Sequence, residues 1–286
     1  MRKTWALMTV FLLVVIGIGW IFSQAWGNPS ILYLAVIFAV LMNFFSYWYS
    51  DKIVVKLAGA RPASREEFFD LYTIIENLSI TAGLPMPKIY VIDDLSPNAF
   101  ATGRDAKHAV VAVTTGLLQI LNKIELEGVI AHELSHIGNR DILVSTVVVV
   151  LVGFVAILSD IFLRSRLYNF RSNDRDNKTG GLLLVLALVA AILAPIGATL
   201  LQLAISRKRE FLADASGALL TRYPEGLASA LKKIGEVSAP LRRASSATAH
   251  LYIANPFGHR VGLTRLFMTH PPIEERIKAL MDSSSL

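Results

Sequence analysis

Cysteine is absent from this chain of 286 residues, and charged residues make up only 17% of it. Without cysteine there are no disulfides and no thiolate metal ligands, so any bound metal would be held by histidine and carboxylate. Hydrophobic residues make up 53%, which is too apolar for an ordinary soluble domain and indicates a membrane protein. The net charge is +6, but no basic stripe is interleaved with aromatic residues. We therefore expect no nucleic-acid partner.

Charge is missing altogether from Thr4 to Ser50. The apolar run is interrupted once, around Gly27, and either side is long enough to cross a bilayer as a helix. A cleaved signal peptide is the alternative for the first segment, but the stretch is long, no small-residue cleavage site is evident and a second span follows at once. Residues 1–50 are therefore predicted to form a transmembrane hairpin. Arg2 and Lys3 precede it and further basic residues follow it, so the positive-inside rule places both ends in the cytoplasm.

Two more uncharged segments, Ile142 to Ser159 and Thr179 to Ser206, form a second apolar pair within residues 142–206. The loop between them, residues 164–178, is basic, which opposes an external position. Either both segments cross or neither does, because one crossing would separate the two halves of the site described below. We expect both to cross.

The motif His132-Glu133-Leu134-Ser135-His136 carries the chemistry. Histidines four apart on a helix lie on one side of it, so both imidazoles can bind one zinc ion, and Glu133 can act on a water at that ion. A helix from about Lys123, capped by Asn122, is predicted to carry the motif. Its expected inward residues are Ile124, Val129, Ile130, Leu134 and Ile137.

A catalytic zinc usually has three protein ligands and an open position for water. Glu210, just after the fourth apolar segment, is the best third ligand for one Zn²⁺ per chain. Asp214 lies four residues later on the same helical face, where it can accept a hydrogen bond from a ligand histidine. The catalytic domain is therefore predicted in two parts, residues 51–141 and 207–286.

Local patterns predict the remaining elements of the first part. Ser64 to Glu67 resembles a capping box for a helix that Gly83 and Pro85 end. Strands are expected over Lys88 to Ile92 and Ala109 to Thr114. The free edge of a strand just before the zinc helix is predicted to pair with an extended substrate backbone.

In this mechanism Glu133 is the general base and returns the proton to the leaving amine. The oxyanion needs another donor. Spacing does not choose among the candidates, which are His250, His259, His270, Arg207, Arg209 and Arg276. Asn98 either shapes the wall beside the substrate strand or caps a turn. His270 is either catalytic or part of a turn that starts a helix at Pro272.

Four motifs together resemble the HtpX family of membrane zinc endopeptidases, which is related to the CAAX prenyl endopeptidases. They are Pro97 to Gly103, Ala131 to His136, Arg209 to Asp214, and Thr269 to Pro272 with Glu275-Arg276 after it. The resemblance covers nearly the whole chain. It implies a mainly α membrane protein, in which transmembrane helices accompany an α+β zincin-like (gluzincin) catalytic domain with a small sheet.

The resemblance further implies zinc ligands at His132, His136 and Glu210, the base at Glu133, and a catalytic domain facing the cytoplasm. It implies quality control of misfolded or damaged membrane proteins, so the expected partners are unfolded polypeptides and the lipid bilayer of the cell membrane. Oligomeric state and cleavage specificity cannot be predicted from the sequence.

Two other classes remain to be weighed. An intramembrane zinc protease would place the motif inside a span, but Glu125, Glu127, Arg140 and Asp141 flank it here. A membrane scaffold or chaperone could hold zinc for structure alone, but structural zinc sites usually have four protein ligands.

Overall fold

The computed structural model describes residues 2–151, 153, 207–237, 239–245, 247–258 and 271–284. The basic loop 164–178, the fourth apolar segment, His259 and His270 therefore lie outside the described residues. The described residues fall into two compact units. One contains residues 2–48 and those described between 147 and 153, and the other contains residues 49–146 and those described after 206.

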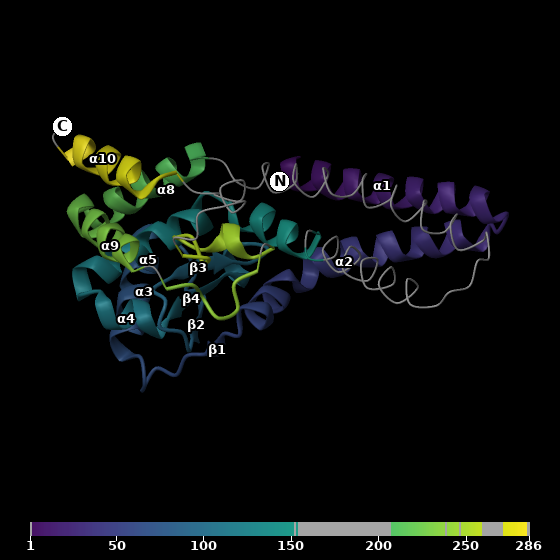
Figure 1. Ribbon diagram of the computed structural model, residues 1–286. Helices are drawn as coiled ribbons and strands as arrows, with labels where there is room; N and C mark the ends of the chain where they lie inside the picture. Colours follow the sequence, from purple (N-terminus) through teal and green to yellow (C-terminus); the bar gives the residue numbers. More distant parts are fainter. Residues whose placement is uncertain are drawn as a thin grey trace, which may run out of the picture. The chain divides into compact units, whose positions relative to one another are not determined.

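The first unit is built on a helical hairpin of α1 (Arg2–Trp26) and α2 (Ser30–Ala58) (Figure 1). The last turns of α2, from residue 49 onward, belong to the second unit. Trp5 and Tyr47 stack with ring centroids 6.1 Å apart, so the first turn of α1 lies beside the later part of α2. Both helices are long and apolar enough to cross a membrane, and a third such span is counted only if α5 (Lys123–Gly138) and the helix Ile142–Leu151 form one bent pair. These aromatic rings suit a membrane–water interface.

The second unit contains a four-stranded sheet with the order β1-β2-β4-β3. Its strands are β1 (Arg61–Pro62), β2 (Lys88–Ile92), β3 (Ala99–Thr102) and β4 (Val110–Thr114). β2 and β4 are parallel, and the two outer strands pair antiparallel to them. Both central strands were predicted, β4 one residue too long. β3 was not predicted as a strand, and it forms the edge of the sheet beside β4.

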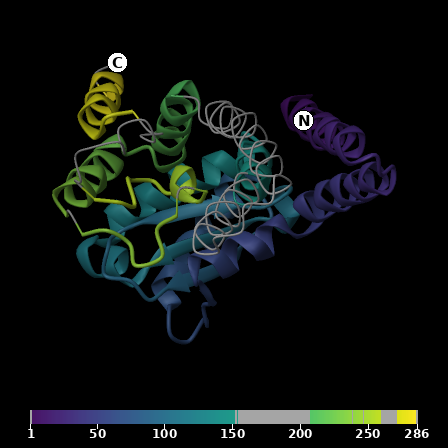
Figure 2. The same cartoon turned by 45° about the vertical axis from the view of Figure 1, so that its right-hand side comes forward.

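Helices pack around α5, which contacts α3 (Phe69–Ala82), α8 (Arg207–Thr221), α9 (Pro224–Glu236) and β3. Three further helices are α4 (Thr115–Ile120), α10 (Ile273–Ser284) and the helix over Ile142–Leu151. The short 3-10 turns are η1 (Ala106–His108) and η2 (Ala249–Leu251). Figure 2 shows α8, α9 and α10 grouped together, with α5 between that group and the sheet. The mainly α class with a small sheet is thus confirmed.

The start of α5 is fixed more firmly than the sequence predicts. The Asn122 side chain accepts a hydrogen bond from the Glu125 N–H, and the Glu125 carboxylate accepts one from the Asn122 N–H. Glu125 also binds Ser229 and Lys233 of α9, which ties the cap to the C-terminal half of the chain. Of the predicted inward residues, Ile124 is wrong, since it is 53% exposed, whereas the other four are buried.

The capping box predicted at the start of α3 is only half formed. The Ser64 hydroxyl accepts a hydrogen bond from the Glu67 N–H, as in a capping box, but the Glu67 carboxylate pairs with Arg61 instead of returning to Ser64. The turn stops there, and α3 begins at Phe69 without a side-chain cap. Its end is as predicted, with Gly83 in the left-handed conformation.

Candidate metalloprotease active site

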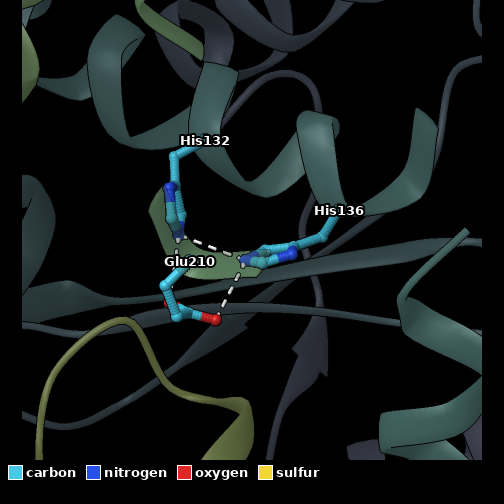
Figure 3. Close-up of side chains that lie close together, drawn as sticks. All are labelled: His132, His136 and Glu210. Carbon is cyan, nitrogen blue, oxygen red and sulfur yellow. Dashed lines mark hydrogen bonds and ion pairs between the residues drawn. The ribbon is translucent and has the colours of Figure 1, made fainter. Parts of the chain in front are cut away.

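The two motif histidines lie one turn apart on α5, and Figure 3 shows their imidazoles converging on the Glu210 carboxylate from α8. The two histidine Nε2 atoms are 3.2 Å apart. Glu210 Oε2 lies 3.9 Å from His132 Nε2, and Glu210 Oε1 lies 3.7 Å from His136 Nε2. These residues are far apart in sequence, so the long-range contact between α5 and α8 creates the cluster.

The spacing of these atoms fits a zinc ion. Zinc–nitrogen and zinc–oxygen bonds of about 2.0–2.2 Å at tetrahedral angles separate two ligand atoms by roughly 3.3–3.6 Å. The three observed separations bracket that range. The donor set of two imidazoles and one carboxylate, with no thiolate, is also that of known catalytic zinc sites. The cluster His132, His136 and Glu210 can therefore hold a metal ion.

A glycine lets α8 approach α5 closely enough for this. A Cβ atom added at Gly217 would lie 2.9 Å from the backbone nitrogen of His132 and 3.1 Å from its Cα. Both neighbours are backbone atoms of a buried helix, so neither can shift alone. The absence of a side chain at Gly217 thus sets the distance at which Glu210 faces the histidines.

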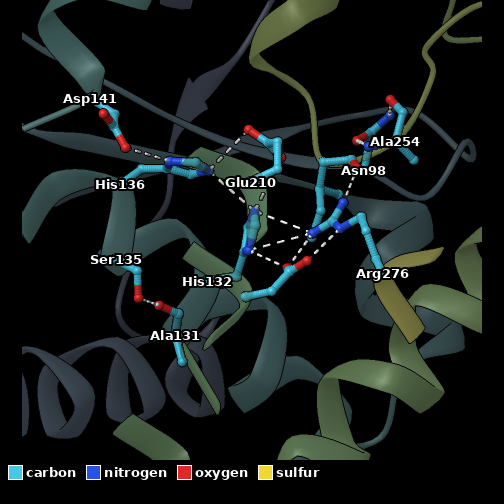
Figure 4. A network of polar contacts seen from close by, with 11 residues as sticks. Asn98, Ala131, His132, Ser135, His136, Asp141, Glu210, Ala254 and Arg276 are labelled. Carbon is cyan, nitrogen blue, oxygen red and sulfur yellow. Dashed lines mark hydrogen bonds and ion pairs between the residues drawn. The ribbon is translucent and has the colours of Figure 1, made fainter. Parts of the chain in front are cut away.

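Asp214 and Arg276 both contact His132, and Figure 4 shows the dashed contacts between Arg276 and this imidazole. Asp214 Oδ1 lies 2.9 Å from His132 Nδ1, and the same carboxylate binds Arg276 at 2.6 and 2.8 Å. When Nδ1 of His132 carries the proton and donates a hydrogen bond to Asp214, Nε2 is unprotonated and can bind a metal. Burial lowers the pKa of His132 to about 4, although Asp214 opposes this shift, and the imidazole is therefore neutral at pH 7.

A second carboxylate orients the other histidine, and sequence reasoning missed it. Asp141 Oδ2 lies 3.5 Å from His136 Nδ1, and Arg209 Nη1 lies 3.4 Å from Asp141 Oδ1. Each motif histidine thus contacts an aspartate, and each of these aspartates contacts an arginine. The available signal was an acidic residue just past the end of α5, where Arg140 has φ of 60° and the chain bends by 84° into the next helix.

Glu133 is 1% exposed and accepts a hydrogen bond from the N–H of Ala101 in β3. Burial raises the pKa of Glu133 to about 7, the charge of Glu210 adds to this, and His136 opposes it. A carboxylate with such a pKa can both take up and release a proton near neutral pH.

The predicted substrate-pairing strand is corrected by the sheet. β4 is the strand that precedes the motif helix α5 in sequence, but it is a central strand whose two edges are paired with β2 and β3. The outer edge belongs to β3. There the Ala99 carbonyl accepts from the Ile253 N–H, and the Gly103 N–H donates to Thr146. Ala101 lies between these positions and faces the metal-site cavity.

Asn98, for which a role in the wall or in a turn was expected, lies just before β3. Its side-chain amide donates to the Ala254 carbonyl at 3.0 Å, and its Oδ1 accepts from the Ala254 and Ala99 N–H groups. Asn98 is 1% exposed. It therefore fastens the segment after η2 to the edge of β3, behind the cavity wall.

A small cavity of about 30 Å³ lies at the metal-site cluster. Its wall includes Ala101, Glu133 and His250, the last of which binds the Ser145 carbonyl through Nε2 at 3.1 Å. Among the described oxyanion candidates, His250 lines this cavity, whereas Arg276 is fully buried against Asp214, Arg209 binds Asp141 and Arg207 is exposed. The volume is that of about one water molecule.

Comparison with known proteins agrees with this geometry. The model of peptidase family M48 matches residues 65–284. A protease HtpX homologue of Caldanaerobacter subterraneus is 50% identical over 284 residues, which cover 98% of this chain and 94% of the relative. One from Pyrococcus furiosus is 49% identical over 280 residues, which cover 97% and 94%.

Among solved structures, the crystal structure of S. mikatae Ste24p is similar, with a TM-score of 0.52 and 20% identity. The match covers 98% of this chain, which spans only 64% of that one, so this likeness shows the fold alone. The sequence matches are much stronger. The chain therefore belongs to peptidase family M48, as an HtpX-like metalloprotease of the membrane.

Proposed function

We propose that this chain is a zinc endopeptidase that cuts unfolded stretches of membrane proteins. The observation that carries the proposal is the convergence of His132, His136 and Glu210 beside the buried carboxylate of Glu133. Bound zinc would supply Lewis-acid chemistry, which acidifies water and polarises the scissile carbonyl. His132, His136 and Glu210 would hold it, and Asp214 would fix the tautomer of His132.

Glu133 is the proposed general base and acid. Its carboxylate takes a proton from the attacking water as the new carbon–oxygen bond forms. It then gives that proton to the amide nitrogen as the carbon–nitrogen bond breaks. The pKa of about 7 suits both transfers. His250 lines the same cavity as Glu133 and is the proposed oxyanion donor. Since its Nε2 binds the Ser145 carbonyl, it would donate through Nδ1 in its protonated form.

An extended peptide is the proposed substrate. Ala101 is the position of the β3 edge that faces the cavity. Because its N–H is bound by Glu133, a substrate backbone would pair there by donating to the Ala101 carbonyl, with the scissile carbonyl pointing at the metal site. Unfolded cytoplasmic loops of damaged membrane proteins have the required conformation, which supports a role in quality control.

For topology, we propose that α1 and α2 cross the cell membrane with the catalytic residues on the cytoplasmic side. We keep the proposed division into a hairpin of residues 1–50, catalytic parts 51–141 and 207–286, and a second apolar pair 142–206. The absence of native cysteine makes this testable. A cysteine placed at exposed Lys107 should react with a membrane-impermeant thiol reagent only after cells are opened, and reaction in intact cells would contradict the proposal.

The central test compares Glu133→Gln with Glu127→Gln, a matched change two turns earlier on α5. With full-length protein in detergent, we expect Glu133→Gln to retain zinc while cleavage of an unfolded casein-like chain falls by at least about 100-fold. Glu127→Gln should cleave normally. Undiminished cleavage by Glu133→Gln would remove this residue from the mechanism.

Glu210→Gln tests the ligand set separately. Zinc content measured by elemental analysis after gel filtration should fall, because one anionic ligand is lost. Substrate conformation is tested with one soluble protein in its folded and denatured forms. The denatured form should be cut much faster, and equal rates would reject the proposed restriction to unfolded chains.

A further inference from the structure

A second and larger cavity, of about 320 Å³, lies in the catalytic unit away from the metal-site cluster. Ligand pockets in proteins occupy about 300–1,000 Å³, so this one suits a small ligand. The end of α2 forms one side of it, and the loop that begins at Leu241 forms another. The lining residues are Ala58, Gly59, Ile92, Asp93, Asp94, Leu241, Arg242, Arg243 and Tyr252.

The wall includes two arginines, Arg242 and Arg243, on a loop whose backbone is held by hydrogen bonds. The Arg242 N–H donates to Asp94 Oδ2 at 2.8 Å, and the Leu241 N–H donates to the Pro256 carbonyl. In the part of the chain that the structure describes, neither guanidinium makes a hydrogen bond or an ion pair, and both side chains are exposed. The loop therefore presents two positive charges with unused donors.

Gly59 shapes the place where one of these charges lies. Its φ of +68° is left-handed, and a Cβ atom added there would come within 2.7 Å of Arg243 Nη1 and 2.9 Å of Arg243 Cδ. The arginine thus lies directly across the glycine that ends α2. This contact brings the guanidinium to the end of a membrane-spanning candidate helix.

Tyr252, a buried residue, also lines this cavity. The residue is 2% exposed, and its ring stands edge-on against Phe100 with centroids 5.2 Å apart. Among the described residues, no hydrogen-bond partner is found for the hydroxyl. Burial raises the pKa of Tyr252 above its usual value, with the charge of Asp94 adding to the shift, so the group remains a donor.

The acidic residues of the wall are already engaged. Asp94 is 6% exposed, and its two oxygens accept from the N–H groups of Ser96 and Arg242. Asp93 pairs with Arg61. Neither carboxylate neutralises the two guanidinium groups directly, so the cavity offers hydrogen-bond donors and positive charge to a ligand.

We propose that this cavity binds a phosphate group through Arg242, Arg243 and Tyr252. Guanidinium forks match phosphate oxygens, and the Tyr252 hydroxyl would add a further hydrogen bond. The phosphate belongs either to a phospholipid headgroup or to a free anion. Position favours the headgroup, because α2 carries Lys52 and Lys56 ahead of the cavity, and basic residues next to a span attract anionic lipids.

The test uses full-length protein in phosphate-free detergent. Inorganic phosphate is titrated and followed by ³¹P NMR, and phosphatidylglycerol or phosphatidylcholine adducts are counted by native mass spectrometry. The double change Arg242→Ala/Arg243→Ala should weaken binding by about tenfold or more, because it removes hydrogen bonds to a charged group. Tyr252→Phe keeps the ring and should weaken it by about threefold.

The control is Lys88→Ala/Lys107→Ala, which removes two exposed positive charges elsewhere in the same unit. Equal weakening by this control and by the arginine change would overturn the proposal in favour of diffuse attraction. Wild-type affinity in Tyr252→Phe would also overturn it, because the ligand would then lie outside the cavity. An arginine-dependent loss seen only with lipid identifies the headgroup as the source, and one seen only with inorganic phosphate identifies the free anion. Either result supports the site.

Discussion

Asp214 of α8 lies between His132 and Arg276, and its Oδ1 is 2.9 Å from the imidazole and 2.6 Å from the guanidinium. Arg276 belongs to α10 and is completely buried. Three segments of the chain therefore meet at one carboxylate behind the candidate metal site. Burial opposes ionisation of Asp214, but Arg276 outweighs it and lowers the pKa of Asp214 to about 2, so this carboxylate is charged at neutral pH.

Removing the guanidinium should unfold the protein more readily. Arg276→Gln leaves Asp214 charged and buried without its main partner, which costs about 3–5 kcal/mol of unfolding free energy. Chemical unfolding in detergent measures it. The control Arg65→Gln breaks the exposed pair with Glu76 and should cost less than about 1 kcal/mol. Similar losses in both variants would show that the buried pair contributes no more to the unfolding free energy than the exposed pair does.

Asp141 should affect metal affinity through His136. In Asp141→Asn the imidazole loses an anionic hydrogen-bond acceptor, and we expect the metal affinity to fall about 10–100-fold. Competition against a chelator measures this independently of catalysis. Asp105→Asn is the control, because Asp105 binds His108 at 2.7 Å on the exposed surface, far from the cluster in sequence. An unchanged metal affinity in Asp141→Asn would show that the contact is incidental.

Gly217→Ala should separate α8 from α5. The added methyl meets the His132 backbone at about 3 Å, and overpacking of this kind typically costs about 1–3 kcal/mol. Since α8 carries Glu210, the metal affinity should fall together with the stability. Ser216→Ala, on the same helix, should change neither by much. A Gly217→Ala protein with normal metal affinity would mean that the helices can adjust without moving Glu210.

Glu133 should destabilise the metal-free protein above acidic pH. Its folded-state pKa of about 7 exceeds the ordinary 4.5, so folding favours the protonated form. The cost of the buried charge is absent below the ordinary pKa, grows as pH rises and is complete above about 7. Glu133→Gln should therefore unfold at a higher temperature than wild type at pH 8 in a chelator, with little difference at pH 4.5. The control Glu127→Gln should follow wild type, and a pH-independent gap would contradict this explanation.

The elements predicted well are those with local signals. Asn122 caps α5 and Gly83 ends α3 through contacts within a few residues, and the composition of the run over Lys88 to Ile92 predicts β2. β3 escaped prediction because Ala99–Thr102 is buried throughout and shows no alternation of apolar and polar residues. Only its pairing with β4 makes it a strand.

The candidate site divides in the same way. Helical spacing places His132 and His136 on one side of α5, and the need for a third ligand pointed to Glu210, which the structure brings to the same cluster. The position of Arg276 behind Asp214 depends on how α10 packs, which no local pattern encodes. Asp141 was missed because it follows the end of α5, where helical spacing no longer applies. The catalytic roles of these residues remain predictions.

The meeting of α5, α8 and α10 at Asp214 has a consequence for biosynthesis. During synthesis, His132 and His136 leave the ribosome long before Glu210 does, and Arg276 leaves it later still. Until that arginine has emerged, Asp214 lacks its partner and the cluster lacks its support. A growing chain would thus carry an incomplete cutting centre until its synthesis is almost finished.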